Sequence, residues 1–249
     1  MSVSKPPAAS PTAFRSPTQP ALSVVVFAHN EAENIPSVLG QLAQWLQQQP
    51  FASEVIFVDD GSSDDSSACA HKALAPVPAR FVRHRQRRGI GAALKSGVRH
   101  ARAPWVTFLP ADGQIAPSAL ATLRAAALDD DVELVCSVYR GRDDGWHRKI
   151  LSGGVRLLIT LTQGIVLDSD GPYLFRRCLF DPAQLPPDSF FLNFEFPIRV
   201  RQAGLRCRTV TIDCHPRRAG RSKSARLSVV AKVAWELVAL RLRRQRRPR

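Results

Sequence analysis

The sequence lacks several features that mark common protein classes. Its 249 residues hold five cysteines but no Cys-x-x-Cys pair, so we expect reduced thiols in a cytoplasmic protein and no paired-cysteine zinc site. No apolar segment follows the start, so a secretory signal is not expected. No uncharged apolar run approaches the roughly 20 residues that a membrane-spanning helix needs.

The sequence also lacks the phosphate-binding motifs of two large nucleotide-binding classes. Gly-x-x-x-x-Gly-Lys-Ser/Thr is absent, and no Gly-x-Gly-x-x-Gly follows the first predicted strand, which argues against an oxidoreductase-type dinucleotide fold. Only 7% of the residues are aromatic, and no nucleic-acid-binding motif is visible. A specific nucleic-acid partner is therefore not expected.

Positive charge is abundant and concentrated in two places. The formal net charge is +14, carried mainly by arginine, with six arginines in residues 241–249 and four in the run 83–88. Such a balance indicates an anionic partner, which could be nucleic acid, a membrane surface or a phosphorylated substrate.

Apolar runs of strand length alternate with amphipathic segments along the chain. Strands are predicted at 22–27, 55–58, 80–82, 105–109 and 132–136, and helices between them. Asn30 is predicted to cap the first helix. This alternation predicts an α/β fold with a mostly parallel, doubly wound sheet and helices on both faces, which binds ligands beyond the carboxyl ends of its strands.

Acidic residues follow three of these strands. Glu31, Asp59, Asp60 and Asp112 would converge on one crevice, although aspartates at such turns also serve as capping residues. Carboxylates there suit ribose hydroxyls, a base N–H or a divalent metal. Asp112 and Gln114 together could ligate Mg²⁺ or Mn²⁺ and leave positions for diphosphate oxygens.

Four motifs in order resemble those of family 2 glycosyltransferases. They are Ser23–Glu31, Val58–Asp64, Arg88–Gly97 and Phe108–Gln114. Four later segments resemble the dolichol-phosphate-mannosyltransferase-like (polyprenyl-phosphate glycosyltransferase) subfamily. They are Arg148–Ser152, Val166–Arg176, Phe191–Gly204 and Arg217–Lys223.

The resemblance implies a GT-A catalytic domain over residues 21–224, preceded by a flexible Pro/Ser-rich leader at 1–20. It also implies an inverting transfer of a sugar from a nucleotide-diphosphate sugar to a polyprenyl (dolichyl or undecaprenyl) phosphate or a related lipid. Because a phosphate acceptor is already anionic near neutral pH, it needs little help from a base, and catalysis can rest on positioning and charge neutralisation.

The same resemblance assigns roles to individual residues. The donor-binding residues are Ala28, Asn30, Glu31, Asp59, Asp60, Gly91, Lys95, Ala111 and Asp112. The metal ligands are Asp112 and Gln114. The acceptor-phosphate residues are Arg140, Arg148, Ser152, Arg217, Ser222 and Lys223. The catalytic residues are Asp112, Glu195 and Arg148.

Pro110 departs from the family pattern, because it stands where the first Asp of D-x-D is usual. The metal site therefore has one ligand fewer or uses a backbone carbonyl or water. Two alternatives stay open. One is a family 2 enzyme that acts on a hydroxyl of a small lipid, pigment or saccharide, with Glu195 or another carboxylate as base. The other is a non-catalytic basic binding protein.

The last segment, residues 225–249, is predicted to be an amphipathic helix with an arginine-rich tail. We expect residues 226–249 to bind an anionic membrane surface, which would make the protein peripheral on the cytoplasmic face. The alternative is a helix packed on the domain with a basic tail. The sugar, the base and the oligomeric state are left open, with GDP-mannose, UDP-glucose and UDP-N-acetylhexosamine all compatible.

Overall fold

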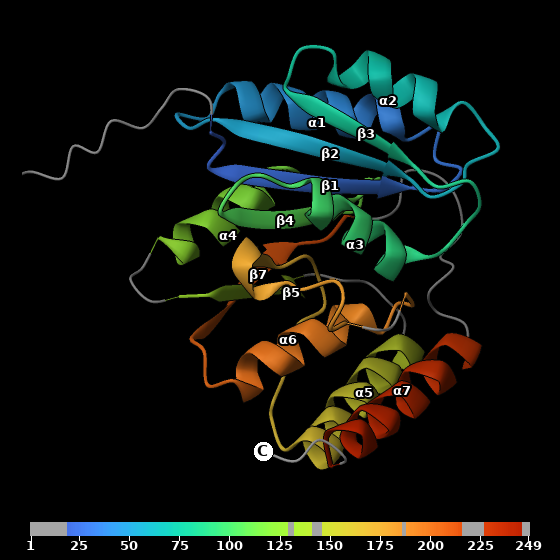
Figure 1. The fold of residues 1–249 in the computed structure, drawn as a ribbon, viewed down its shortest axis with the longest axis vertical. Coiled ribbons are helices and arrows are strands. Elements are labelled where there is room, and N and C mark those ends of the chain that lie inside the picture. The colour runs from blue at the N-terminus through green and yellow to red at the C-terminus, as the bar shows by residue number, and fades with distance from the viewer. Residues whose placement is uncertain (1–18, 129–131, 141–145, 186–187, 216–226, 246–249) are drawn as a thin grey trace, which may run out of the picture.

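The fold was analysed in a computed structural model of the chain (Figure 1). It describes residues 19–128, 132–140, 146–185, 188–215 and 227–245, with backbone alone at 146–152, 227–230 and 243–245. The predicted leader and residues 216–226 lie outside this description, except for residues 19–20 of the leader.

The described strands form one seven-stranded sheet in the order β3-β2-β1-β4-β6-β5-β7. The strands are β1 Leu22–Ala28, β2 Ser53–Asp59, β3 Ala79–Arg83, β4 Trp105–Pro110, β5 Leu134–Arg140, β6 Leu174–Arg176 and β7 Cys207–Asp213. The first four strands pair in parallel, as do β5 and β7, while β6 runs antiparallel between β4 and β5. The predicted α/β fold with a mostly parallel sheet is confirmed.

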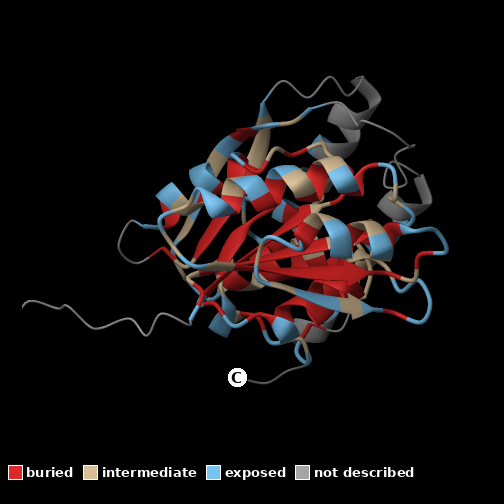
Figure 2. Cartoon of the chain, turned by 90° about the horizontal axis from the view of Figure 1, so that it is seen from above, coloured by how far each residue is buried: buried red, intermediate tan, exposed pale blue. Residues whose placement is uncertain are grey.

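Helices cover both faces of this sheet, as predicted (Figure 2). The helices are α1 Ile35–Gln47, α2 Ser66–Leu74, α3 Ile90–His100, α4 Ala119–Ala127, α5 Trp146–Gln163, α6 Leu192–Gln202 and α7 Leu227–Gln245, with a 3₁₀ turn at Arg177–Leu179. Because successive strand residues point to opposite faces, Val24 and Val26 pack with α1, α2 and α4, whereas Val25 packs with α3, α6 and α7. The apolar runs are thus buried on both sides.

Two local predictions need correction. Asn30 does not cap α1, which begins five residues later at Ile35; Pro36 suits its first turn because it has no N–H to leave unpaired. Asn30 instead adopts a left-handed backbone (φ 54°). The strand predicted at 132–136 occupies Leu134–Arg140, and neither the short antiparallel β6 nor β7 was predicted.

The carboxy-terminal helix α7 lies beside α5 at one end of the molecule (Figure 1). Val233, Leu237 and Leu240 are spaced along one face of α7 and are buried in the domain. The predicted helix is therefore present, and one of its faces belongs to the core. No helix in the described part of the chain is long and apolar enough to cross a membrane.

Candidate functional site

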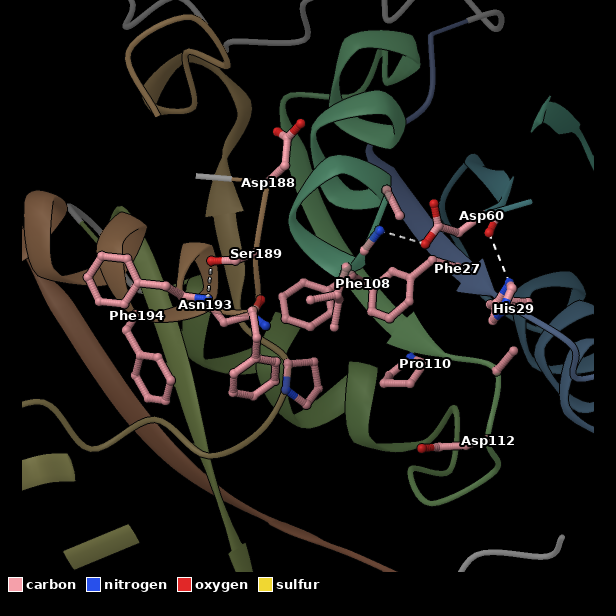
Figure 3. Close-up of a pocket in the computed structure, with 18 of the residues that line it drawn as sticks. Phe27, His29, Asp60, Phe108, Pro110, Asp112, Asp188, Ser189, Asn193 and Phe194 are labelled. Carbon is pink, nitrogen blue, oxygen red and sulfur yellow. Dashed lines mark hydrogen bonds between the residues drawn. The ribbon is translucent and has the colours of Figure 1, made fainter. Parts of the chain in front are cut away.

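A cavity of about 760 Å³ opens beyond the carboxyl ends of β1, β2 and β4. Six residues predicted to bind donor or metal line its wall together: Ala28, Glu31, Asp60, Ala111, Asp112 and Gln114. In Figure 3, Asp60 and His29 lie on one side of the cavity and Ser189, Asn193 and Phe194 on the other, with Phe108 between them. Three of the four predicted strand-end acids, Glu31, Asp60 and Asp112, do converge on one crevice.

Asp60 holds the start of α3 through its carboxylate. Its Oδ1 accepts hydrogen bonds from the Arg88 backbone N–H (2.8 Å) and from His84 Nδ1 (2.7 Å), and its Oδ2 accepts one from the Gly89 N–H (2.8 Å). The backbone carbonyl of Asp60 accepts a bond from His29 Nδ1 (3.0 Å). Asp60 is therefore fixed in place and still borders the cavity.

Asp59 and Asn30, by contrast, do not line the cavity; they shape the turns beside it. Asp59 is buried, where its Oδ1 accepts the Ser62 N–H (2.8 Å) and its Oδ2 lies 3.4 Å from Arg83 Nε. The side-chain carbonyl of Asn30 accepts the Ser63 N–H (2.9 Å). These two predicted donor-binding residues join the ends of β1 and β2 to the following loop.

Gly91 and Lys95 support a neighbouring loop and do not line the cavity wall. A Cβ at Gly91 would lie 2.5 Å from the Ser189 carbonyl oxygen, so glycine is needed for the 188–189 backbone to approach α3. Lys95 Nζ and Arg88 Nη2 each donate to the Asp188 carboxylate at 2.9 Å. Burial opposes ionisation of Asp188, but these hydrogen bonds outweigh it and lower its pKa.

Glu195 is fully buried within α6 and does not reach the cavity. Its Oε1 accepts bonds from Arg199 Nε (2.9 Å) and Nη2 (2.6 Å), one helical turn away. Arg199 does not line the cavity either. The structure therefore does not bring Glu195 to the predicted reaction site.

The predicted acceptor-phosphate residues are described only in part. Arg140 is exposed at the end of β5, and Arg148 and Ser152 lie one turn apart on α5, whose backbone alone is described there. Arg217, Ser222 and Lys223 lie outside the described residues.

Sequence reasoning missed the wall that α7 and the 188–194 segment provide. Lys232, Val233 and Glu236 of α7 line the cavity, and both Glu236 carboxylate oxygens accept bonds from the Ser189 hydroxyl (2.8 and 2.9 Å). Arg87 and Lys232 border the cavity and have no ion-pair partner within the described ranges. The signal for this wall in the sequence was the presence of a glutamate and a lysine within an otherwise apolar helix.

The metal prediction rests on few donors. Asp112 and Gln114 both line the cavity, and Asp112 Oδ1 accepts the Gln114 backbone N–H (3.2 Å). Pro110 lines the same wall and contributes no side-chain oxygen. Across the described ranges, no three His, Cys, Asp or Glu side chains are placed so that they could hold a metal ion together. The fit to a metal is therefore partial, because substrate or water must supply most of the ligands.

A family model and several curated proteins match the chain. Residues 23–222 match the family model "Glycosyl transferase family 2". The undecaprenyl-phosphate 4-deoxy-4-formamido-L-arabinose transferases of Sodalis glossinidius and Salmonella choleraesuis are 32% and 30% identical over 164 residues. These matches cover 64% of this chain and 50% of each relative, so the chain spans about half their length.

Solved structures of glucosyl-3-phosphoglycerate synthase from Mycobacterium tuberculosis share the fold. One, in complex with Mn²⁺, UDP and glucosyl-3-phosphoglycerate, aligns with a TM-score of 0.66 at 24% identity over 92% of this chain and 81% of that chain. Another, in complex with Mg²⁺ and UDP, aligns with a TM-score of 0.67 at 24% identity and the same coverage. The GT-A fold expected from the sequence is confirmed.

Proposed function

The chain belongs to glycosyl transferase family 2, and from this we propose that it transfers a sugar from a nucleotide-diphosphate sugar to a polyprenyl phosphate, with inversion at the anomeric carbon. The observation that carries the proposal is the cavity beyond β1, β2 and β4, which gathers Glu31, Asp60 and Asp112. Parallel α/β sheets bind ligands at this edge. The names of the undecaprenyl-phosphate transferases support a polyprenyl-phosphate acceptor.

The donor would lie against the β1, β2 and β4 ends. Glu31 and Asp60 would accept hydrogen bonds from the nucleoside, and Ala28 and Ala111 leave room for it because their side chains are small. Glu31 already accepts a bond from Asn34 Nδ2 (2.7 Å), which fixes its carboxylate at the cavity wall. A fixed acceptor loses less conformational entropy when a ligand binds.

A divalent metal is part of the proposal, as Mn²⁺ or Mg²⁺ accompanies UDP in the structural relatives. Asp112 and Gln114 would hold it in this chain, with the diphosphate completing its ligands. Such an ion would supply charge neutralisation for the leaving diphosphate.

A phosphate acceptor is favoured over a hydroxyl acceptor, because several carboxylates that line the cavity already have hydrogen-bond or ion-pair partners. Asp188 pairs with Lys95 and Arg88, Asp170 with Arg156 (2.6 Å), and Glu236 accepts the Ser189 hydroxyl. Although burial opposes it, hydrogen bonds from Lys95 and Arg88 lower the pKa of Asp188, which makes that carboxylate a weak base. Glu195, the base considered for a hydroxyl acceptor, is buried away from the cavity. A phosphate needs no such base.

The acceptor phosphate would be held by cations at the cavity wall. Arg87 and Lys232 line the cavity. We propose that they act with the residues assigned by resemblance, namely Arg140, Arg148, Ser152, Arg217, Ser222 and Lys223. In a cavity partly closed to water, these charges would bring the acceptor oxygen to the anomeric carbon and offset repulsion between the two anionic substrates.

We further propose that the outer faces of α5 and α7 rest on an anionic membrane surface. Leu157 and Leu161 of α5 are 60% and 72% exposed, and Trp235 of α7 is 71% exposed. Val238 and Leu242 extend the α7 stripe. Arginines of the 241–249 tail would add about 1 kcal/mol each near anionic lipid. The protein would then be cytoplasmic and peripherally bound, close to its lipid acceptor.

The membrane proposal can be tested by liposome flotation of the full chain. Trp235→Gln with Leu242→Gln should reduce flotation with anionic liposomes, and high salt should reduce that of the wild type. Leu128→Gln is the matched control, because Leu128 is equally exposed (68%) at the far end of α4. Equal flotation of the double variant and the control would exclude this surface.

The catalytic proposal can be tested by a thermal-shift screen of UDP, GDP and their sugars with and without Mn²⁺. Stabilisation by one nucleotide is expected, and Asp112→Asn should abolish turnover with that donor while the protein stays folded. Asp181→Asn is the control, since Asp181 is exposed in a loop outside the cavity. Stabilisation by no nucleotide, or full turnover by Asp112→Asn, would contradict the proposal.

A further inference from the structure

The basic run at residues 83–88 is only partly explained by the proposed function, which uses Arg87 at the cavity wall. In the structure, this run packs against the Asp59–Ser62 turn. Arg83 Nη2 donates to the Ser62 carbonyl (3.1 Å), and a Cβ at Gly61 would lie 2.5 Å from the Gln86 carbonyl carbon. Two loops that follow neighbouring strands are therefore in direct backbone contact.

His84 is the centre of this contact. Its side chain is 7% exposed, and its backbone N–H donates to the Asp59 carbonyl (2.9 Å). Its Nδ1 lies 2.7 Å from Asp60 Oδ1, and its Nε2 lies 2.9 Å from Ser96 Oγ on α3. Because a carboxylate only accepts, Nδ1 donates the bond to Asp60, and Nε2 bonds to the Ser96 hydroxyl on the other side of the ring.

These bonds leave Asp60 with limited acceptor capacity. A carboxylate offers about four lone-pair positions. Three are taken by His84 Nδ1, the Arg88 N–H and the Gly89 N–H. The fourth belongs to Oδ2, and Asp60 borders the cavity.

The order Ser96, His84, Asp60 also occurs in serine hydrolases. Ser96 cannot act as a nucleophile in this conformation, because it lies within α3, is 8% exposed and does not line the cavity. The chain of hydrogen bonds instead runs from α3 to the carboxylate that faces the cavity.

We infer that His84 is a positioning residue, which holds Asp60 so that one lone pair of Oδ2 meets an N–H or hydroxyl of the donor nucleoside. This inference rests on the proposed function, because it needs a nucleoside diphosphate in the cavity. His84 acts through Asp60 and also fixes the turn that carries Arg87 and Arg88 at the cavity wall. Ser96 lies at the far end of this chain of hydrogen bonds and fixes the His84 ring.

The test uses calorimetry on the full chain. It measures the affinity for whichever of UDP and GDP binds the wild type and, in parallel, the affinity for pyrophosphate. His84→Phe should weaken nucleotide binding about tenfold, since Asp60 loses its charge-assisted partner. Pyrophosphate binding should stay unchanged. His84→Asn, which keeps a donor near Nδ1, should recover most of the affinity.

His100→Asn is the matched control, because His100 ends α3, the helix that carries Ser96, and among the described residues its side chain bonds only to the Ser96 backbone carbonyl (2.8 Å). A folded His84→Phe variant that binds the nucleotide with wild-type affinity would overturn the positioning role and leave the proposed function standing. Equal weakening of nucleotide binding and pyrophosphate binding would do the same. If His84→Phe does not fold, His84→Asn with near-wild-type nucleotide affinity supports the role, and a larger loss overturns it. A wild type that binds neither nucleotide would refute the proposed function together with this inference.

Discussion

Replacing Gly91 by alanine tests whether the 188–189 backbone must lie against α3. The new methyl group would sit 2.5 Å from the Ser189 carbonyl oxygen and 2.6 Å from the Asp188 carbonyl carbon, where ordinary contacts begin at 3.4 Å. Both neighbours are backbone atoms, so no side-chain rotation relieves the contact. The loop must retreat by about 1 Å, at the usual overpacking cost of about 1–3 kcal/mol.

The helix preference of alanine opposes this overpacking cost and must be subtracted from it. Alanine is about 1 kcal/mol more favourable than glycine inside a helix. The net loss in the free energy of unfolding for Gly91→Ala should therefore be about 1 kcal/mol. Retreat of the loop would also stretch the Ala92 N–H to Asp188 carbonyl bond (3.2 Å) and the Lys95–Asp188 pair (2.9 Å).

Gly40→Ala in α1 is the matched control. Gly40 has no neighbouring atom within 4 Å of an added Cβ, so only the helix preference remains and the protein should gain about 1 kcal/mol. Urea unfolding followed by circular dichroism would compare the two variants. A Gly91→Ala protein as stable as Gly40→Ala would refute the close packing of this loop on α3.

Three further predictions concern groups outside that contact. The hydroxyl of Tyr173 is fully buried with no hydrogen-bond partner among the described residues, so Tyr173→Phe should raise the free energy of unfolding by about 1–2 kcal/mol in urea melts; a loss would contradict this. Burial raises the pKa of Cys136 to about 12, so at pH 8 a thiol reagent should label exposed Cys178 rapidly and Cys136 only after unfolding; rapid labelling of Cys136 in the native protein would refute its burial. Although burial opposes it, hydrogen bonding from Lys95 and Arg88 lowers the pKa of Asp188 below 3.8, so its stabilisation is complete above that pH and lost as pH falls through the lowered value. The stability difference between wild type and Asp188→Asn should thus be constant at neutral pH and shrink in acid; a difference that disappears already near pH 6 would refute the ion pairs.

The adjacent pair Asp59 and Asp60 illustrates the limit of sequence reasoning at the site. Both were predicted to bind the donor from a shared motif. Asp59 ends β2 and Asp60 follows it; Asp60 borders the cavity, while Asp59 turns toward Ser62 and Arg83. The motif located the turn correctly. Which of its two aspartates faces the cavity depended on the elements that pack on each side of the turn.

Glu195 illustrates the same limit within a helix. Its place in a family-like segment suggested a catalytic role, and the helix itself is present as α6. The Glu195 carboxylate is nevertheless directed into the interior, where it meets Arg199. Helix formation follows from local sequence, whereas the direction that one side chain faces depends on how the helix docks.

The sequence by itself determined the alternation of strands and helices and the presence of acids at three strand ends, because period-two and helical patterns are local and each strand end is marked within a few residues. Only the tertiary structure decided which groups meet. Lys95 reaches Asp188 across 93 positions and Ser189 reaches Glu236 across 47, bringing α7 to the cavity wall. Such contacts depend on the packing of whole elements, and no local pattern encodes them.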